Sequence, residues 1–274
     1  MQVGSEAHKE LYCRAFLEGH RKYEPEDLPW PDLQGDDLKL IQGIPFWDHA
    51  LQAEADAGPM VKACAEVATD PLIREALALQ GYEEERHGRT IQHMIDRYEI
   101  EINEIHVEMP PNVEEAFIDF GFEECLDSFG AFGLFELARR SQLVPRELFE
   151  IFDQVMQEEA HHIVFFINWF AHRQINRGLV AGATVGPKAA WHYAKALSKL
   201  GGIFFGGDSD EGEDFVVTGA AAFVDNLTPS LVLETSLTEN ERRLAGFDRD
   251  LLRPNFVPRV ARTMLPVLKL LPFG

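Results

Sequence analysis

Apolar residues recur at intervals of three and four positions along four long segments of the chain, at about residues 45–67, 71–98, 113–141 and 145–175. This spacing places apolar side chains along one face of an α-helix. Asp70 followed by Pro71 is typical of a helix start, with Asp70 as the N-cap, and Pro145 opens the fourth segment in the same way. The β-branched runs that indicate strands are absent. The pattern therefore predicts an all-α fold.

An irregular stretch at 100–112 separates the first two long helices from the last two. Short turns join the helices within each pair, so we expect two hairpins joined by one long connection. This arrangement predicts a four-helix bundle with a long crossover. We expect three parts: residues 1–44 as an N-terminal helix and linker packed on the bundle, 45–178 as the bundle, and 179–274 as a C-terminal helical extension.

Shorter elements flank the four long helices. Residues 5–22 have the pattern of a short amphipathic helix, and the Pro- and Asp-rich residues 24–37 follow as a linker. After residue 178, Gly-rich joints and an acidic loop at 206–215 separate further predicted helices near 187–200 and 228–243. We expect these extra helices to pack against the bundle.

Composition and charge exclude several classes of protein. The chain has 274 residues, 46% of them apolar, and a formal net charge of −21. It lacks the clustered Lys and Arg that bind phosphates, so we expect no nucleic-acid partner. Its three scattered cysteines and its polar amino terminus favour a reducing, cytoplasmic location. The sequence contains no run of about 18 apolar residues, so we expect no membrane-spanning helix.

The last residues, 257–274, are basic and apolar in an otherwise acidic chain. They fit either peripheral contact with a membrane surface or packing on the body or on another subunit, as in a homodimer. Pro266 and Pro272 interrupt any long helix, which favours packing.

Two short motifs carry the chemistry of this sequence. They are Glu84-x-x-His87 in the second long helix and Glu159-x-x-His162 in the fourth. Residues three apart lie on one face of a helix, so each pair offers a carboxylate oxygen and an imidazole nitrogen together. Iron, manganese and zinc accept such ligands. Both motifs stand at nearly the same depth below the turn of their hairpin, which predicts one shared site.

The partner helices supply acids at matching depth. In the first hairpin this acid is Glu54, which lies among small apolar residues. In the third helix, Glu124 and Asp127 are both candidates, because they are three residues apart and share a face. Several acids without a metal would converge in an apolar interior at a cost of about several kcal/mol each.

Two Glu-x-x-His motifs on alternate helices, each preceded by a helix with an acid, resemble the ferritin-like di-iron carboxylate superfamily over about residues 45–175. The resemblance implies two iron ions, or a manganese and an iron ion, with Glu84 and Glu159 as bridging ligands. The third-helix ligand of this family is usually Glu, which favours Glu124, whereas hairpin symmetry favours Asp127. The other ligands implied are Glu54, His87 and His162.

The resemblance further implies oxygen chemistry. We expect a di-iron oxygenase or oxidase that uses dioxygen, an electron donor and a small apolar organic substrate. The alternatives are a protein for iron oxidation, iron storage or peroxide removal, and a helical interaction protein without catalysis. The Phe-rich stretches at 117–135 and 165–170 are expected first as core and second as walls of a substrate pocket.

Other polar residues near the motifs have ordinary explanations. His161 should face away from the site, since it lies about 100° round the helix from His162. We expect Glu83, Glu85 and Glu158 to be solvated or paired with Arg86 and Arg89. His49 and His93 are expected in core or surface roles, and Cys125 in the core.

Overall fold

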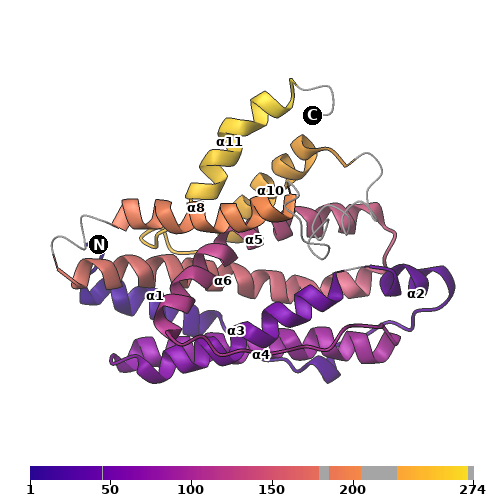
Figure 1. Cartoon of the computed structure of the whole chain (residues 1–274), viewed down its shortest axis with the longest axis horizontal. Helices are drawn as coiled ribbons and strands as arrows, with labels where there is room; N and C mark the ends of the chain where they lie inside the picture. Colours follow the sequence, from indigo (N-terminus) through magenta and orange to yellow (C-terminus); the bar gives the residue numbers. More distant parts are fainter. Residues whose placement is uncertain (45, 179–184, 205–226, 271–274) are drawn as a thin grey trace.

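The computed structural model describes residues 1–44, 46–178, 185–204 and 227–270, and these are helical with no strand (Figure 1). The predicted all-α class is therefore confirmed. Among the described residues, no helix is both long enough and apolar enough to cross a membrane. The acidic stretch 206–215 and Pro272 lie outside the described residues.

Four long helices form the centre of the molecule: α3 (Trp47–Val67), α4 (Pro71–Tyr98), α5 (Val113–Ser141) and α6 (Arg146–Asn176). α3 packs along α4, α5 packs along α6, and α3 also contacts α5. Asp70 caps α4 by accepting hydrogen bonds from the backbone of Leu72 and Ile73, as its sequence predicts. All four helices begin and end within two residues of the predicted positions.

The connection between α4 and α5 contains no helix, again as predicted. It is fixed to α3 by polar contacts. Asp48 accepts hydrogen bonds from the backbone and side-chain nitrogens of Asn103, and Gln52 exchanges two with the backbone of His106. The connection therefore crosses the outer surface of α3 (Figure 1).

The amino-terminal elements are α1 (Glu6–Gly19), the 3₁₀ turn η1 (Pro25–Asp27) and α2 (Gly35–Gln42). α1 packs on α6 and α4, while η1 and α2 contact α4. The sequence did not predict α2, since residues 24–37 were expected as linker. Its first residues, 35–37, are polar, and the helix is held by burial of Ile41.

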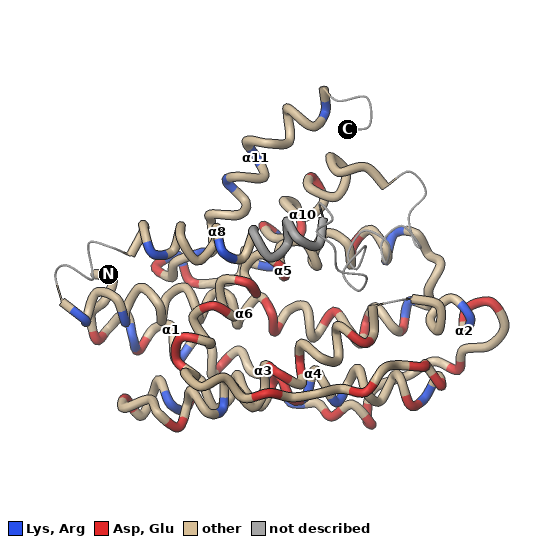
Figure 2. Tube along the Cα trace, viewed as in Figure 1, with Lys and Arg blue, Asp and Glu red and all other residues tan. Residues whose placement is uncertain are grey.

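The carboxyl-terminal elements are α8 (Val185–Phe204), α10 (Pro229–Leu244) and α11 (Phe256–Leu268). α8 and α10 pack on α5, and α11 packs on α10 and projects from the body (Figures 1 and 2). α11 has only 13 residues and ends two residues after Pro266, which agrees with the expectation that this proline interrupts any long helix here. Pro258 lies in the first turn of α11, where a backbone N–H has no partner within the helix and its absence costs little.

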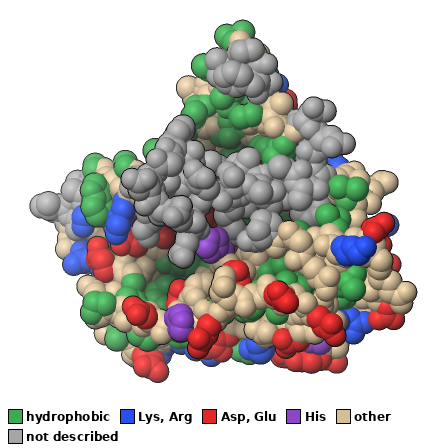
Figure 3. Space-filling model, turned by 45° about the vertical axis from the view of Figure 1, so that its right-hand side comes forward, with side chains coloured by type: hydrophobic (Ala, Val, Ile, Leu, Met, Phe, Trp, Pro, Cys, Tyr) green, Lys and Arg blue, Asp and Glu red, His purple; other side chains and the backbone are tan. Residues whose placement is uncertain are grey.

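The described core divides into two apolar clusters along the long helices. In α3 one cluster contains Leu51 and the other begins at Met60, and in α6 Phe149 belongs to one and Ala160 to the other. Glu54, the Glu84 motif and the Glu159 motif lie between these clusters. Acidic side chains are scattered over the face of the molecule drawn in Figure 3, whereas Glu84, between the clusters, is buried.

The closest approach of α10 to the bundle helices depends on Gly133 of α5. A β-carbon at Gly133 would lie 2.7 Å from the backbone nitrogen of Ser236. A β-carbon at Gly130, three residues earlier, would meet nothing within 4 Å. The two glycines therefore form a matched pair on one helix.

We predict that Gly133→Ala destabilises the protein by about 1–3 kcal/mol through overpacking against α10. Gly130→Ala should instead stabilise it by about 0.5–1 kcal/mol, because alanine favours the helix. Urea unfolding followed by circular dichroism measures both values. Equal stability of the two variants would show that α10 does not pack as described.

Candidate metal centre

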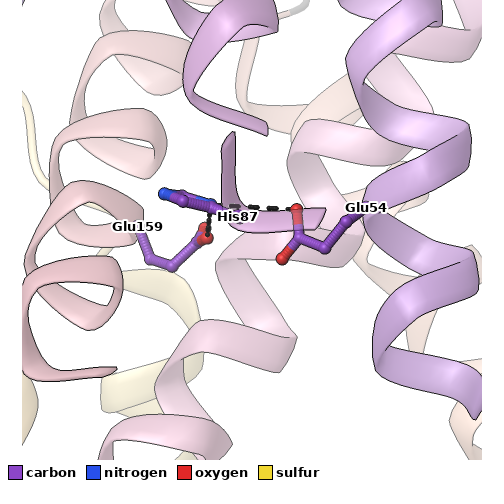
Figure 4. A group of neighbouring side chains, drawn as sticks. All are labelled: Glu54, His87 and Glu159. Carbon is purple, nitrogen blue, oxygen red and sulfur yellow. Dashed lines mark ion pairs between the residues drawn. The ribbon is translucent and has the colours of Figure 1, made fainter. Parts of the chain in front are cut away.

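Six of the predicted ligands meet at one place. They come from all four long helices, as Figure 4 shows for three of them, whose side chains point toward one another: Glu54 of α3, His87 of α4 and Glu159 of α6. Both histidine side chains are fully buried, and Glu84 and Glu124 are also buried. Each Glu-x-x-His pair presents both side chains on one helical face, because three residues make nearly one turn.

The first half of the centre surrounds His87. Its Nδ1 lies 3.0 Å from Glu159 Oε1, 3.7 Å from Glu54 Oε2 and 3.8 Å from Glu84 Oε2. Glu54, His87 and Glu159 place their ligand atoms close enough together to hold one ion.

The second half surrounds His162. Its Nδ1 lies 3.2 Å from Glu84 Oε1, 3.3 Å from Glu124 Oε1 and 3.5 Å from Glu159 Oε2. Glu84, Glu159 and His162 form a second group able to hold one ion. Glu84 and Glu159 thus take part in both halves, with one oxygen of each beside His87 and the other beside His162.

Several atoms of the centre have no hydrogen-bond partner although they are buried. They are Nδ1 of both histidines and both carboxylate oxygens of Glu124. Orphaned buried polar atoms are rare in folded proteins and call for a specific explanation. A divalent cation supplies one here, since carboxylate oxygens and imidazole nitrogens suit iron, manganese and zinc. Four carboxylates also balance the charge of two such ions, so the residues fit a two-metal site.

Without a cation, the buried carboxylates of the centre oppose one another's ionisation. Burial raises the pKa of Glu54 and of Glu124 well above the usual value, and neighbouring carboxylates add to the effect. Burial raises the pKa of Glu84 likewise. For Glu159, burial acts in the same direction, but contacts with His162 and His87 outweigh it and hold the pKa well below normal.

The outer nitrogen of each histidine is held by a buried glutamate from the other motif. His87 Nε2 donates to Glu158 Oε2 at 2.9 Å, and His162 Nε2 donates to Glu83 Oε2 at 3.0 Å. With Nε2 donating outward, the Nδ1 of each neutral histidine is left to bind a metal ion, which is the tautomer a metal requires. Burial opposes ionisation of Glu83, but its contacts with His162 and His20 lower its pKa to about 2.

Sequence reasoning missed this role of Glu83 and Glu158. Both are buried, so of the two expected environments, solvent or an arginine partner, only the arginine partner is found. The expected arginine contact does form: Arg86 donates to Glu158 at 2.7 Å. The signal was present as a Glu directly before each ligand Glu, which makes both motifs Glu-Glu-x-x-His.

Three further histidines, His161, His49 and His93, lie where the sequence predicted. His161 contacts Phe247 and the backbone of Gln157, away from the centre. His49 is exposed, and His93 stacks on Trp30. Cys125 is buried in the core, as expected.

Of the two third-helix candidates, the structure brings Glu124 to the centre and leaves Asp127 exposed. Glu124 belongs to a buried stripe at helical spacing, formed by Phe117, Gly121, Glu124 and Ser128. A β-carbon at Gly121 would collide with the ring of Phe166, so the glycine lets α6 approach one turn before Glu124.

Comparisons with protein families, curated proteins and solved structures found no significant match. The function is therefore inferred from the side chains of the centre.

We predict that Glu124→Ala lowers the number of metal ions bound per chain, whereas Asp127→Ala leaves it unchanged. The first variant removes a buried ligand beside His162, and the second removes an exposed side chain. Elemental analysis after loading and desalting gives both numbers. An equal loss of metal in the two variants would contradict the assignment of Glu124.

We further predict that Mn(II) stabilises the protein, by about 2.7 kcal/mol at a free concentration one hundred times Kd. Glu84→Gln should abolish this gain while leaving the metal-free protein as stable as before or more so, because it removes a charge buried among other acids. Thermal unfolding with and without Mn(II) measures both effects. A variant that keeps the full metal-dependent shift would exclude Glu84 as a ligand.

Proposed function

We propose that the protein is a di-iron oxidoreductase that uses dioxygen on a small organic substrate, built on a ferritin-like four-helix bundle with a long crossover. The proposal rests above all on the shared position of Glu84 and Glu159. Each places one carboxylate oxygen near His87 and the other near His162. This is the arrangement that two bridging carboxylates between neighbouring metal ions require.

The ligand set favours iron in oxygen chemistry. Bound there, two iron ions would supply the electrons that reduce dioxygen. The protein holds four hard oxygen donors and two neutral imidazoles for them, with Glu54 serving the half at His87 and Glu124 the half at His162.

The centre has one side by which small molecules can reach it. The side chains of Glu54 and Glu159 are 17% and 14% exposed, whereas those of Glu84 and both histidines are 3% or less. Dioxygen and substrate should therefore approach along Glu54 and Glu159. Their carboxylates, as flexible single side chains, are also placed to move when a substrate arrives.

Besides access for small molecules, oxygen chemistry requires that bulk water be kept from the centre, and aromatic side chains pack beside it. Phe16 lies against the His162 ring with ring centres 5.8 Å apart, and Phe165 packs on Phe16 at 4.9 Å. Phe122 and Phe166 pack edge to face at 5.0 Å deeper in the core. The Phe-rich stretches are thus core, as first expected, and Phe16 of α1 covers the ring of His162.

A single experiment tests the function. Metal-free protein is given excess Fe(II) in air, while an electrode records dioxygen uptake and desalting removes loose iron. We expect uptake in proportion to the bound iron and about two irons retained per chain, as in other two-metal sites. Retention of far more iron would identify a storage protein instead.

Variants make the test specific. Glu159→Ala should abolish oxygen uptake, because it removes a carboxylate shared by both halves. His161→Ala, which changes a neighbouring histidine that faces Phe247, should keep uptake at the wild-type level. Wild-type protein that retains iron but consumes no dioxygen would overturn the proposed chemistry while leaving the metal site.

A further inference from the structure

A pocket lies on the outer side of the histidines, where the segment after α1 and the turn η1 lie along α4. It has a volume of about 560 Å³ and is lined by His20, Lys22, Tyr23, Glu24, Asp27, Leu79, Tyr82 and Arg86. None of these residues is a ligand of the candidate metal centre. The volume is in the range of sites for small organic molecules.

One wall of the pocket is joined to His162. His20 Nδ1 lies 2.6 Å from Glu83 Oε1, and the other oxygen of Glu83 accepts the hydrogen bond of His162 Nε2 at 3.0 Å. A single buried carboxylate therefore connects the pocket residue His20 with the second half of the centre.

A neighbouring wall is joined to His87 in the same manner. Tyr23 donates from its hydroxyl to Glu158 Oε2 at 2.9 Å, and the same oxygen accepts from His87 Nε2 at 2.9 Å. Arg86 fixes this link by donating to the other oxygen of Glu158 at 2.7 Å, with its guanidinium 4.0 Å from the centre of the Tyr23 ring.

Orientation of the two histidines requires Glu83 and Glu158 alone. The contacts that His20 and Tyr23 make with these glutamates from one pocket are therefore not needed to orient the histidines, and they call for another explanation. Hydrogen-bonded links of this kind couple groups across the low-dielectric interior. Both halves of the centre are thus connected to one small-molecule-sized pocket, by two links of matching construction.

We propose that this pocket binds a planar redox-active ring, a reduced flavin or a hydroquinone, which delivers two electrons to the metal centre through these two links. The inference rests on the proposed function and names the class of its electron donor. Such a ring loses two electrons and two protons. The electrons convert two ferric ions to ferrous ions, the protons pass to water, and the ring leaves oxidised.

The lining fits a neutral aromatic ring. Tyr23, Tyr82 and Leu79 provide flat and apolar surface, while the cation Lys22 is balanced by the nearby acids Glu24 and Asp27. The pocket therefore lacks the surplus of positive charge that a phosphate-bearing nucleotide would need. Tyr82 is held in place by its hydrogen bond to Glu24 at 2.8 Å.

The first test measures binding to metal-free protein. Riboflavin and 2-methyl-1,4-naphthoquinone are titrated separately, with riboflavin fluorescence and tyrosine quenching as readouts, so the two arms distinguish a flavin from a quinone. Leu79→Trp fills the pocket without removing a hydrogen bond and should cause loss of binding. Trp191→Ala, which removes an exposed aromatic side chain on α8, should bind as the wild type does.

Failure of both rings to bind the wild type, or binding unaffected by Leu79→Trp, would overturn the proposal. Because no metal is present, neither result bears on the proposed function.

The second test measures electron delivery in iron-loaded protein under argon. The ring that binds is reduced and mixed with oxidised protein, and the absorbance of the centre is followed by stopped flow. With the ring at a saturating concentration, the double variant His20→Ala/Tyr23→Phe should keep its iron but lose the fast phase of reduction. His161→Ala should retain that phase.

A double variant reduced as fast as the wild type would overturn the role of the two links. If the wild type holds no iron, the proposed function fails, and electron delivery to it fails as well, whereas ring binding is still decided by the first test.

Discussion

Four carboxylates and two imidazoles converge in an interior that water hardly reaches. The rest of the structure must offset the free-energy cost of burying these charged groups together. Burying such charges without partners costs about several kcal/mol each. The raised pKa values of Glu54, Glu84 and Glu124 express that cost. Helices of 21 to 31 residues, with apolar clusters on both sides of the centre, supply the hydrophobic burial that offsets it.

The centre has a closed side and an open side, and the division follows from the chain's topology. On the closed side, α1 and the segment after it cover the face of α4 and α6 that carries Glu83 and Glu158, each with a side chain only 2% exposed. On the open side, Glu54 and Glu159 keep some contact with solvent. The proposed function, which would admit dioxygen on one side and electrons from another, needs this separation.

The periodicity of apolar residues and the capping residues were enough to predict the long helices, because both act over a few neighbouring residues. Asp70 and Pro71, for example, located the start of α4. Such signals fail for α2, which is short. Spacing also predicted that the Glu and His side chains of both motifs converge at one place. Depth in the hairpin favoured Asp127, which is exposed, whereas Glu124 lies in the buried stripe through Gly121 and reaches the centre. Glu83 and Glu158 looked like surface acids because the cover that buries them comes from α1, far away in sequence.

The crosswise support of the histidines has a consequence for how α4 and α6 fit together. An apolar helix interface tolerates small sliding and repacking, since its contacts have no direction. Here each helix carries a ligand histidine and also the glutamate that orients the histidine of the other helix. Sliding α4 by one turn would break both hydrogen bonds at once, together with the contact from Arg86 of α4 to Glu158 of α6, at a cost above that of an apolar shift. The polar pairs therefore fix the register of the two helices, and with it the positions of Glu84 and Glu159 between the two halves.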